Sequence, residues 1–332
     1  MAIKTFSEAV DSTIAEEMRR DPTIFHITGI SLGSRNSIEE FGWKRIAYAG
    51  ICETQIAGSG VGAALAGTRP IVSLGMTDFA VDGWGQIVLQ AAKIHFKLGY
   101  RADCPAVFTM GFGAVPGGSL SVHHTGSFHN WLANAPGLLV AVPSMPADAQ
   151  GLWRTALRTT KDPVCMLTAS GVAGVKGPVP DDNSTMIPFG KAEIKREGAD
   201  VTIAAVGYMV HLALEAAEDL AKEGIDAEVW DPRTLTPFDR ESLINSVYKT
   251  GAMVVVDHAP ESFGTTGEFA ITVAEAITPA PPVARVASKD TPVPASPALE
   301  PYLYPNKDKV MNAVYDVLER KNGAGDLGIQ KN

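Results

Sequence analysis

The sequence predicts an α/β protein with two doubly wound domains, each built on a mostly parallel sheet. Two observations carry this prediction. Apolar runs of strand length, such as residues 70–75 and 106–110, alternate with segments of helical periodicity. The alternation stops at residues 171–188, where Gly, Pro, Asp, Asn and Ser dominate, and then begins again. We therefore expect domains over residues 1–185 and 186–322, followed by a flexible tail over 323–332.

The elements of the first domain follow from its apolar pattern. Buried runs predict strands at residues 24–28, 45–49, 70–75, 106–110, 138–144 and 164–167. Amphipathic stretches predict helices after Ser7, after Glu53, over 84–98 and over 148–157. In the second domain the same signals predict strands at 201–206, 227–230, 252–257 and 283–286 and helices at 212–222, 240–250, 267–277 and 309–319.

Composition excludes several classes of partner. The chain carries a net charge of −9 and has no Lys/Arg run longer than two, so we expect no nucleic-acid partner. Its longest apolar runs are strand-sized, and its start lacks the layout of a signal peptide, so we expect no membrane partner. Cys52, Cys104 and Cys165 form no C-x-x-C pair, which favours a reduced, cytoplasmic protein.

Three candidate functional segments lie where predicted strands end. They are Glu53, the turn around Phe79, and the loop with His123 and His124. Ligands of open α/β sheets bind outside the carboxyl ends of the strands, so we expect these segments to converge. Glu53 has two interpretations: a charge that stabilises the start of a helix, or a carboxylate aimed at a bound heterocycle.

The histidines also leave alternatives open. A metal site at His123, His124 and His129 is disfavoured because the spacing fits neither a helical pair nor a known zinc pattern. A loop histidine that moves protons near a ligand and a histidine that only bonds backbone both remain possible interpretations. The glycines at 111, 113, 117 and 118 do not match a dinucleotide fingerprint, and they indicate a flexible loop at the active site.

Several ordered sequence blocks resemble one known family. They include Ile51-Cys52-Glu53, Thr77-Asp78-Phe79, His124-Thr125-Gly126-Ser127, Ala135-Pro136-Gly137-Leu138 and Asp290-Thr291-Pro292-Val293-Pro294. Over nearly its whole length the chain resembles the beta subunit of the thiamine-diphosphate-dependent decarboxylating component of 2-oxo acid dehydrogenases. Pyruvate, branched-chain and acetoin enzymes form this group within the transketolase-like superfamily. The two domains would then be a pyrimidine-binding domain and a transketolase C-terminal-like domain.

The resemblance implies roles for individual residues. Glu53 would hydrogen-bond the pyrimidine ring nitrogen and activate the cofactor, and His124 would be the second catalytic residue. Ile51, Phe79 and Gln86 would complete the cofactor site, with Phe79 stacked on the pyrimidine. His123 and His124 would line the substrate pocket. The chain itself would hold no metal.

The resemblance also implies partners. The family's diphosphate motif, G-D-G followed by N, does not occur in this sequence. An alpha-type subunit would therefore supply the diphosphate and Mg²⁺ site, as two alpha and two beta chains, and a lipoyl acyltransferase would be a possible acceptor of the acyl unit. The expected activity is cleavage of a 2-oxo acid, or a related dicarbonyl or ketol, next to its carbonyl. Alternatives are a transketolase-like or carboligase half-enzyme without a lipoyl acceptor, and a non-catalytic homologue.

Three departures from the family pattern bear on the pocket. Gly29 is followed by Ile30 and Ser31 where relatives carry Glu and Asp, and Thr168 stands where most relatives have Glu. The stretch His123-His124-Thr125-Gly126 also differs from the family's usual Gln/Tyr-His-Ser-Gln. These differences predict a pocket unlike that of an ordinary pyruvate enzyme.

Overall fold

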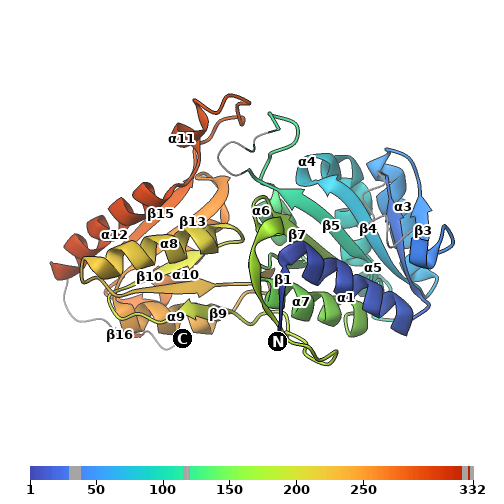
Figure 1. The fold of residues 1–332 in the computed structure, drawn as a ribbon, viewed down its shortest axis with the longest axis horizontal. Coiled ribbons are helices and arrows are strands. Elements are labelled where there is room, and N and C mark those ends of the chain that lie inside the picture. The colour runs from blue at the N-terminus through green and yellow to red at the C-terminus, as the bar shows by residue number, and fades with distance from the viewer. Residues whose placement is uncertain (30–38, 115–117, 119, 324–327, 330–332) are drawn as a thin grey trace. The chain divides into compact units, whose positions relative to one another are not determined.

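Contacts between residues divide the chain into two units. The structure is a computed structural model that describes residues 1–29, 39–114, 118, 120–323 and 328–329. One unit comprises residues 1–112, 123–189 and 235–237, and the other comprises 113–122, 190–234 and 238–332. The order of elements along the chain can be followed in Figure 1. Each unit is built on its own sheet.

The first unit has a seven-stranded sheet with the order β12-β6-β7-β5-β4-β2-β3. Its strands are β2 (Ile24–Thr28), β3 (Ile46–Tyr48), β4 (Arg69–Met76), β5 (Val107–Phe112), β6 (Leu139–Ala141), β7 (Val164–Ala169) and β12 (Thr234–Thr236). The neighbouring pairs from β6 to β3 are parallel. Val107, Phe108 and Cys165, at the centre of the sheet, are fully buried, which explains their continuous apolar sequence.

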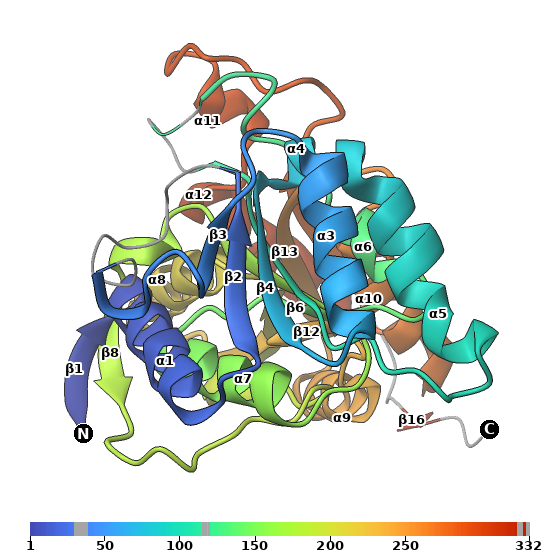
Figure 2. The same ribbon diagram turned by 90° about the vertical axis from the view of Figure 1, so that its right-hand side faces the viewer.

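Helices cover both faces of this sheet. They are α1 (Phe6–Arg20), α3 (Glu53–Leu65), α4 (Thr77–Ala80), η1 (Val81–Gly83), the π-helical η2 (Gly85–Ala91), α5 (Ala92–Lys97), α6 (His129–Ala133), α7 (Pro146–Arg158) and η3 (Val172–Gly174). Figure 2 shows α1 and α7 on one side of β2 and β4, with α3 and α5 on the other side. Parallel strands need helical crossovers of this kind, so the layered arrangement follows from the topology.

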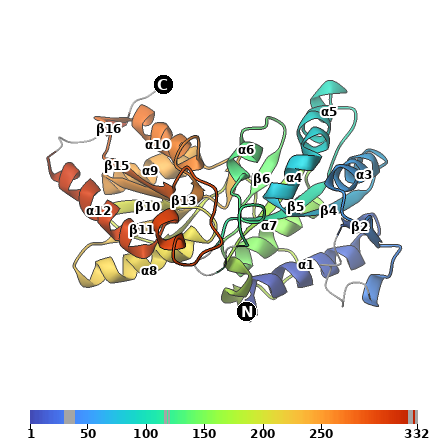
Figure 3. The same cartoon turned by 90° about the horizontal axis from the view of Figure 1, so that it is seen from above.

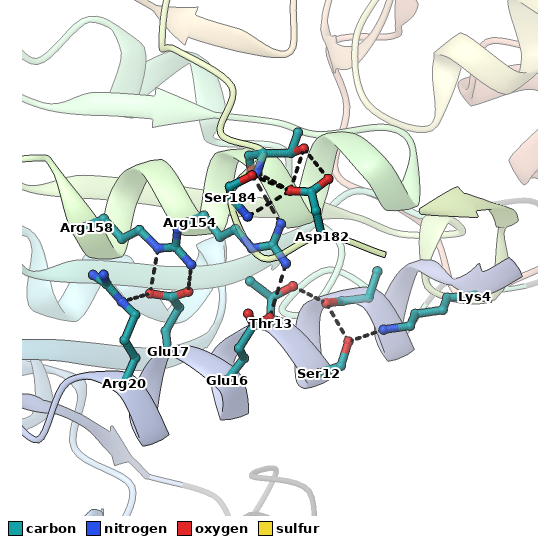
Figure 4. A network of polar contacts seen from close by, with 12 residues as sticks. Lys4, Ser12, Thr13, Glu16, Glu17, Arg20, Arg154, Arg158, Asp182 and Ser184 are labelled. Carbon is teal, nitrogen blue, oxygen red and sulfur yellow. Dashed lines mark hydrogen bonds and ion pairs between the residues drawn. The ribbon is translucent and has the colours of Figure 1, made fainter. Parts of the chain in front are cut away.

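Buried ion pairs fasten α1 to α7. The carboxylate of Glu17 is fully buried and accepts hydrogen bonds from Arg158 Nε at 2.9 Å and from Arg20 Nε at 3.1 Å. The buried Arg154 donates to Glu16 Oε2 at 3.1 Å and to the carbonyl of Thr185 at 3.3 Å (Figure 4). These bonds also hold the segment that follows the first sheet against α7.

The second unit has a five-stranded sheet with the order β15-β13-β10-β11-β9. Its strands are β9 (Glu193–Arg196), β10 (Val201–Ala205), β11 (Ala227–Asp231), β13 (Met253–Pro260) and β15 (Val283–Ser288), and only β9 among them runs antiparallel to its neighbour. Its helices are α8 (Met209–Lys222), α9 (Arg240–Thr250), α10 (Thr265–Ala276), α11 (Glu300–Leu303) and α12 (Lys307–Asn322). Figure 3 shows α8 and α12 on one face of this sheet and α9 and α10 on the other.

The structure confirms the predicted α/β class and its mostly parallel sheets, and it differs from the sequence prediction in some segments. The composition of residues 171–188 indicated a linker, but β8 (Lys176–Val179) lies within that range and pairs antiparallel with β1 (Ala2–Thr5). The described residues of the segment after β5, namely 113–114, 118 and 120–122, group with the second unit, and residues 235–237 group with the first. The predicted helix over 84–98 is a π-helical turn followed by α5.

The end of the chain is only partly described. Most of the predicted tail over 323–332, namely residues 324–327 and 330–332, lies outside the described residues. Gly328–Ile329 forms β16, which pairs antiparallel with β14 (Ile277–Thr278). Across the described part of the chain, no helix is both long and apolar enough to cross a membrane.

Candidate active site

A small recess lies at the carboxyl ends of β2 and β4. The two strands are neighbours and run parallel with Thr28 opposite Ser73, so their ends meet at one edge of the sheet. The recess has a volume of about 10 Å³, and its lining comes from both strand ends and from the start of α3: Thr28, Gly29, Glu53, Ile56, Ser73, Leu74 and Gly75. Glu53 contributes the ionisable side chain of this lining.

Glu53 is the first residue of α3 and is half-buried. The helix has no side-chain cap, because Cys52 at the N-cap position makes no such hydrogen bond. Among the described residues, none donates a hydrogen bond or forms an ion pair with the Glu53 carboxylate. A helix start favours a negative charge, so this position stabilises the carboxylate without occupying its oxygens. The group is therefore placed to accept a hydrogen bond from a ligand.

Two glycines allow the backbones around the recess to approach closely. A Cβ atom added at Gly29 would lie 2.6 Å from Ile56 Cδ1 and 2.8 Å from the Gly50 carbonyl oxygen. Gly75 has a φ of +73°, and a Cβ there would lie 3.2 Å from the ring of Phe79. A side chain at either position would displace α3 or the Phe79 turn, so the shape of the recess requires glycine here.

Phe79 lies in α4, the single helical turn that follows β4 directly. Its ring contacts the imidazole of His124 edge to face, with centroids 5.0 Å apart and an angle of 89° between the rings. The structure thus brings together two of the three segments predicted to converge. Gly75 links this pair to the recess, because it both lines the recess and abuts the Phe79 ring.

Hydrogen bonds hold the histidine loop to the same turn. The Gly126 amide donates to the two carboxylate oxygens of Asp78 at 3.2 and 3.0 Å. The Thr77 hydroxyl donates to the Gly126 carbonyl at 3.1 Å. Burial raises the pKa of the Asp78 carboxyl, while its hydrogen bonds and the charges of His124 and His123 act in the opposite direction. Sequence reasoning assigned no role to Asp78.

The other predicted residues lie farther from the recess lining or in different surroundings. Ile51 is 72% exposed and does not line the recess. Gln86 is half-buried on η2, where its Cγ atom would lie 3.4 Å from a Cβ at Gly58 in α3. His123 is exposed. The roles assigned to these residues remain predictions.

The third histidine of the loop is in a different environment. His129 is fully buried at the start of α6, with its ring centroid 4.5 Å from that of Phe112, whereas His123 and His124 are exposed. In the described ranges, no group of three or more His, Cys, Asp or Glu side chains could hold a metal ion. Ile30 and Ser31, which stand where the resemblance leads us to expect Glu and Asp, lie outside the described residues, as do residues 115–117 of the glycine-rich loop.

Comparison with known proteins identifies the family. The transketolase pyrimidine binding domain matches residues 3–172, and the transketolase C-terminal domain matches residues 190–310. The chain is 35% identical to the 2-oxoisovalerate dehydrogenase subunit beta of Bacillus subtilis, with 96% of this chain and 100% of that protein covered. It is 37% identical to the acetoin:2,6-dichlorophenolindophenol oxidoreductase subunit beta of the same organism, over 86% of this chain and 83% of that one. The chain belongs to the transketolase-like family of 2-oxo acid dehydrogenase beta subunits.

Other relatives agree with this assignment. The mitochondrial pyruvate dehydrogenase E1 subunit beta-1 of Arabidopsis thaliana is 35% identical over 93% of this chain and 88% of its own length. Among solved structures, a split-gene transketolase described as an inactive beta4 tetramer matches with a TM-score of 0.78 and 26% identity, covering 95% of this chain and 98% of that one. The resemblance and the fold class predicted from the sequence are both confirmed.

Proposed function

We propose that this chain is the beta subunit of a thiamine-diphosphate-dependent enzyme that cleaves a 2-oxo acid, or a related dicarbonyl or ketol, next to its carbonyl. The observation that carries the proposal is the unengaged Glu53 carboxylate, which lines the recess at the carboxyl ends of β2 and β4. The relatives that support it are named as dehydrogenase or oxidoreductase beta subunits acting on 2-oxoisovalerate, acetoin and pyruvate.

The residues present suit the aminopyrimidine part of the cofactor. A flat heterocycle needs a hydrogen-bond partner for its ring nitrogen and an apolar face to lie on. Glu53 offers the first, and the half-buried ring of Phe79 offers the second. When bound, thiamine diphosphate supplies an electron sink for the bond next to the substrate carbonyl. In our proposal Glu53 holds a proton at the ring nitrogen, Phe79 fixes the ring's orientation, and Gln86 and Ile51 complete its surroundings.

His124 is proposed as the residue that moves a proton on the substrate side. Its exposed imidazole lies against Phe79, so it is adjacent to the proposed cofactor site and accessible from solvent. Imidazole changes its charge near neutral pH, which suits proton transfer. His123, beside it, is proposed to line the substrate pocket.

The partner follows from what this chain lacks. The sequence has no G-D-G…N motif for the diphosphate, so an alpha-type chain is proposed to bind the diphosphate with Mg²⁺. Two alpha and two beta chains are the proposed assembly, and a lipoyl acyltransferase is the proposed acceptor. The three free cysteines, two of them buried, support the proposal that the protein is cytoplasmic.

Reconstitution tests this function directly. The chain is expressed with a candidate alpha-type chain from the same organism, chosen for its G-D-G…N motif, and the purified complex is assayed with pyruvate, branched-chain 2-oxo acids and acetoin, using an artificial electron acceptor. We expect turnover of at least one of these substrates by the complex and by neither chain alone. A complex that binds thiamine diphosphate but acts only on ketose phosphates would contradict the proposal in favour of a transketolase-like half-enzyme.

A further inference from the structure

The turn that carries Phe79 makes hydrogen bonds with Gly126 of the histidine loop. The backbone amide of Gly126 donates to Asp78 at 3.2 and 3.0 Å, and its carbonyl accepts from the Thr77 hydroxyl at 3.1 Å. One residue of the loop is therefore held on both its donor and its acceptor by two adjacent residues of the turn. His124 lies only two residues before this anchor.

The closeness of the contact requires the glycine. A Cβ atom at position 126 would lie 2.5 Å from Asp78 Oδ1 and 2.7 Å from Phe128 Cε2, so any other residue would displace the carboxylate. The residues on either side, Thr125 and Ser127, are buried, whereas His123 and His124 are exposed. The loop is thus held by burial and hydrogen bonds at residues 125–127, while the imidazoles of His123 and His124 are exposed to solvent.

Asp78 supplies the carboxylate of this turn that accepts hydrogen bonds from the histidine loop. On the elements next to this turn, the other carboxylates are Asp82 in η1 and Glu53 at the start of α3. Neither makes a hydrogen bond or an ion pair with the histidine loop in the described structure.

We propose that Asp78 is a positioning residue, which anchors Gly126 so that His124 lies against Phe79. The inference rests on the proposed function, because it assigns Asp78 to the histidine that acts on the substrate. The charge-assisted hydrogen bonds from the Gly126 amide to the Asp78 carboxylate fix where the imidazole lies.

The position of His124 is tested by modifying its imidazole with diethyl pyrocarbonate at one fixed pH. The rate is followed by mass spectrometry of the peptide that contains His124, using the full chain in its complex. In Asp78→Ala we expect this rate to rise at least about threefold, because the loop no longer holds the imidazole against Phe79. In Asp78→Asn, which keeps an acceptor for Gly126, and in Asp82→Asn, an exposed carboxylate in the next element, the rate should stay at the wild-type value.

The anchoring effect is tested by hydrogen exchange of the peptide that contains Gly126. Asp78→Ala removes the acceptor, so the Gly126 amide should exchange at least about tenfold faster. The Asn side chain of Asp78→Asn retains an oxygen, so it should restore most of the protection. Rescue of both the exchange rate and the His124 modification rate by this conservative variant is not expected of a residue that merely stabilises the fold.

The results overturn the inference if His124 in Asp78→Ala is modified at the wild-type rate, or if Asp78→Ala leaves exchange of Gly126 unchanged. Both readouts work without cofactor or turnover. Failure of the inference therefore differs from failure of the proposed function, which would appear as a lack of 2-oxo acid turnover with the Asp78 effects intact.

Discussion

The ring of Phe79 and the imidazole of His124 meet edge to face, with centroids 5.0 Å apart and an angle of 89° between the rings. This contact joins the turn after β4 to a loop that follows β5 by ten residues or more along the chain. It places Phe79, the proposed apolar face for the pyrimidine, beside His124, the proposed proton-transfer residue. Several consequences of this arrangement can be measured.

Phe79 is expected to contribute to cofactor binding. Removing the ring in Phe79→Ala deletes both its contact with His124 and the apolar face offered to the pyrimidine. Aromatic contacts of this kind contribute about 0.5–1.5 kcal/mol beyond area burial. Calorimetric titration of the complex with thiamine diphosphate should therefore give a dissociation constant raised about three- to tenfold, whereas Phe79→Tyr should bind like wild type. Equal affinities for Phe79→Ala and wild type would contradict the assignment.

The buried pair between Glu17 and Arg158 is expected to govern the stability of the first unit. Glu17 is fully buried and also accepts from Arg20, so Glu17→Ala leaves Arg158 without its partner (Figure 4). Breaking such a pair costs about 3–5 kcal/mol of the free energy of unfolding, measured here by urea titration. Glu40→Ala, which removes an exposed pair with Arg19, should cost far less. Similar losses in both variants would refute the special role of burial.

His26 is expected to make the protein less stable in mild acid. Burial lowers its pKa to about 4, and its Nε2 atom is buried with no hydrogen-bond partner among the described residues. The unfolded chain takes up the proton below about pH 6.5, whereas the folded chain does so only near pH 4, so the free energy of unfolding falls as pH drops through this window. Between pH 7 and pH 5, wild type should lose about 1–2 kcal/mol more than His26→Leu. Parallel pH profiles for the two proteins would rule this out.

Two glycines of α3, Gly60 and Gly62, differ in the space around them, so alanine variants of the two can be compared. A Cβ at Gly60 would lie 2.3 Å from Val72 Cγ2 in β4, whereas a Cβ at Gly62 meets nothing within 4 Å. Gly60→Ala should therefore reduce the free energy of unfolding by about 1–3 kcal/mol, and Gly62→Ala should raise it by up to about 1 kcal/mol. Because α3 begins at Glu53, Gly60→Ala should also weaken thiamine diphosphate binding. Unfolding titrations that show the same sign for both changes would contradict the close packing of α3 on β4.

Much of the fold could be predicted because buried strands are encoded by continuous apolar sequence. Residues 203–206 and 252–256 are apolar without alternation, because β10 and β13 are buried on both faces of the sheet. The pairing of β1 with β8 could not be predicted in this way. Its register joins Ala2 to Val179, and the β8 sequence Lys-Gly-Pro-Val has neither alternation nor strong strand propensity. Strands so far apart in sequence pair only because the folded unit brings them together, and neither strand's own sequence indicates the partner.

In the candidate site too, some residues could be predicted from the sequence and some contacts could not. Glu53, Phe79 and His124 could be proposed because each follows a predicted strand end, where parallel sheets bind ligands. The hydrogen bonds between Asp78 and Gly126 join residues 48 positions apart, and no periodicity in the sequence marks them. Asp78 was visible only as the middle residue of Thr77-Asp78-Phe79. Its hydrogen bonds with the histidine loop could be seen only in the structure.

The most direct measurement concerns Glu53, whose carboxylate has the central role in the account. In the complex with its alpha-type partner, Glu53→Gln keeps the size of the side chain but removes the acid. We expect oxidation of the 2-oxo acid substrate with an artificial electron acceptor to fall at least about 100-fold, with the melting temperature unchanged. Glu40→Gln, an exposed acid of the same unit, serves as the control and should retain full activity. Activity of Glu53→Gln within a few-fold of wild type would contradict the assignment of Glu53 to cofactor activation.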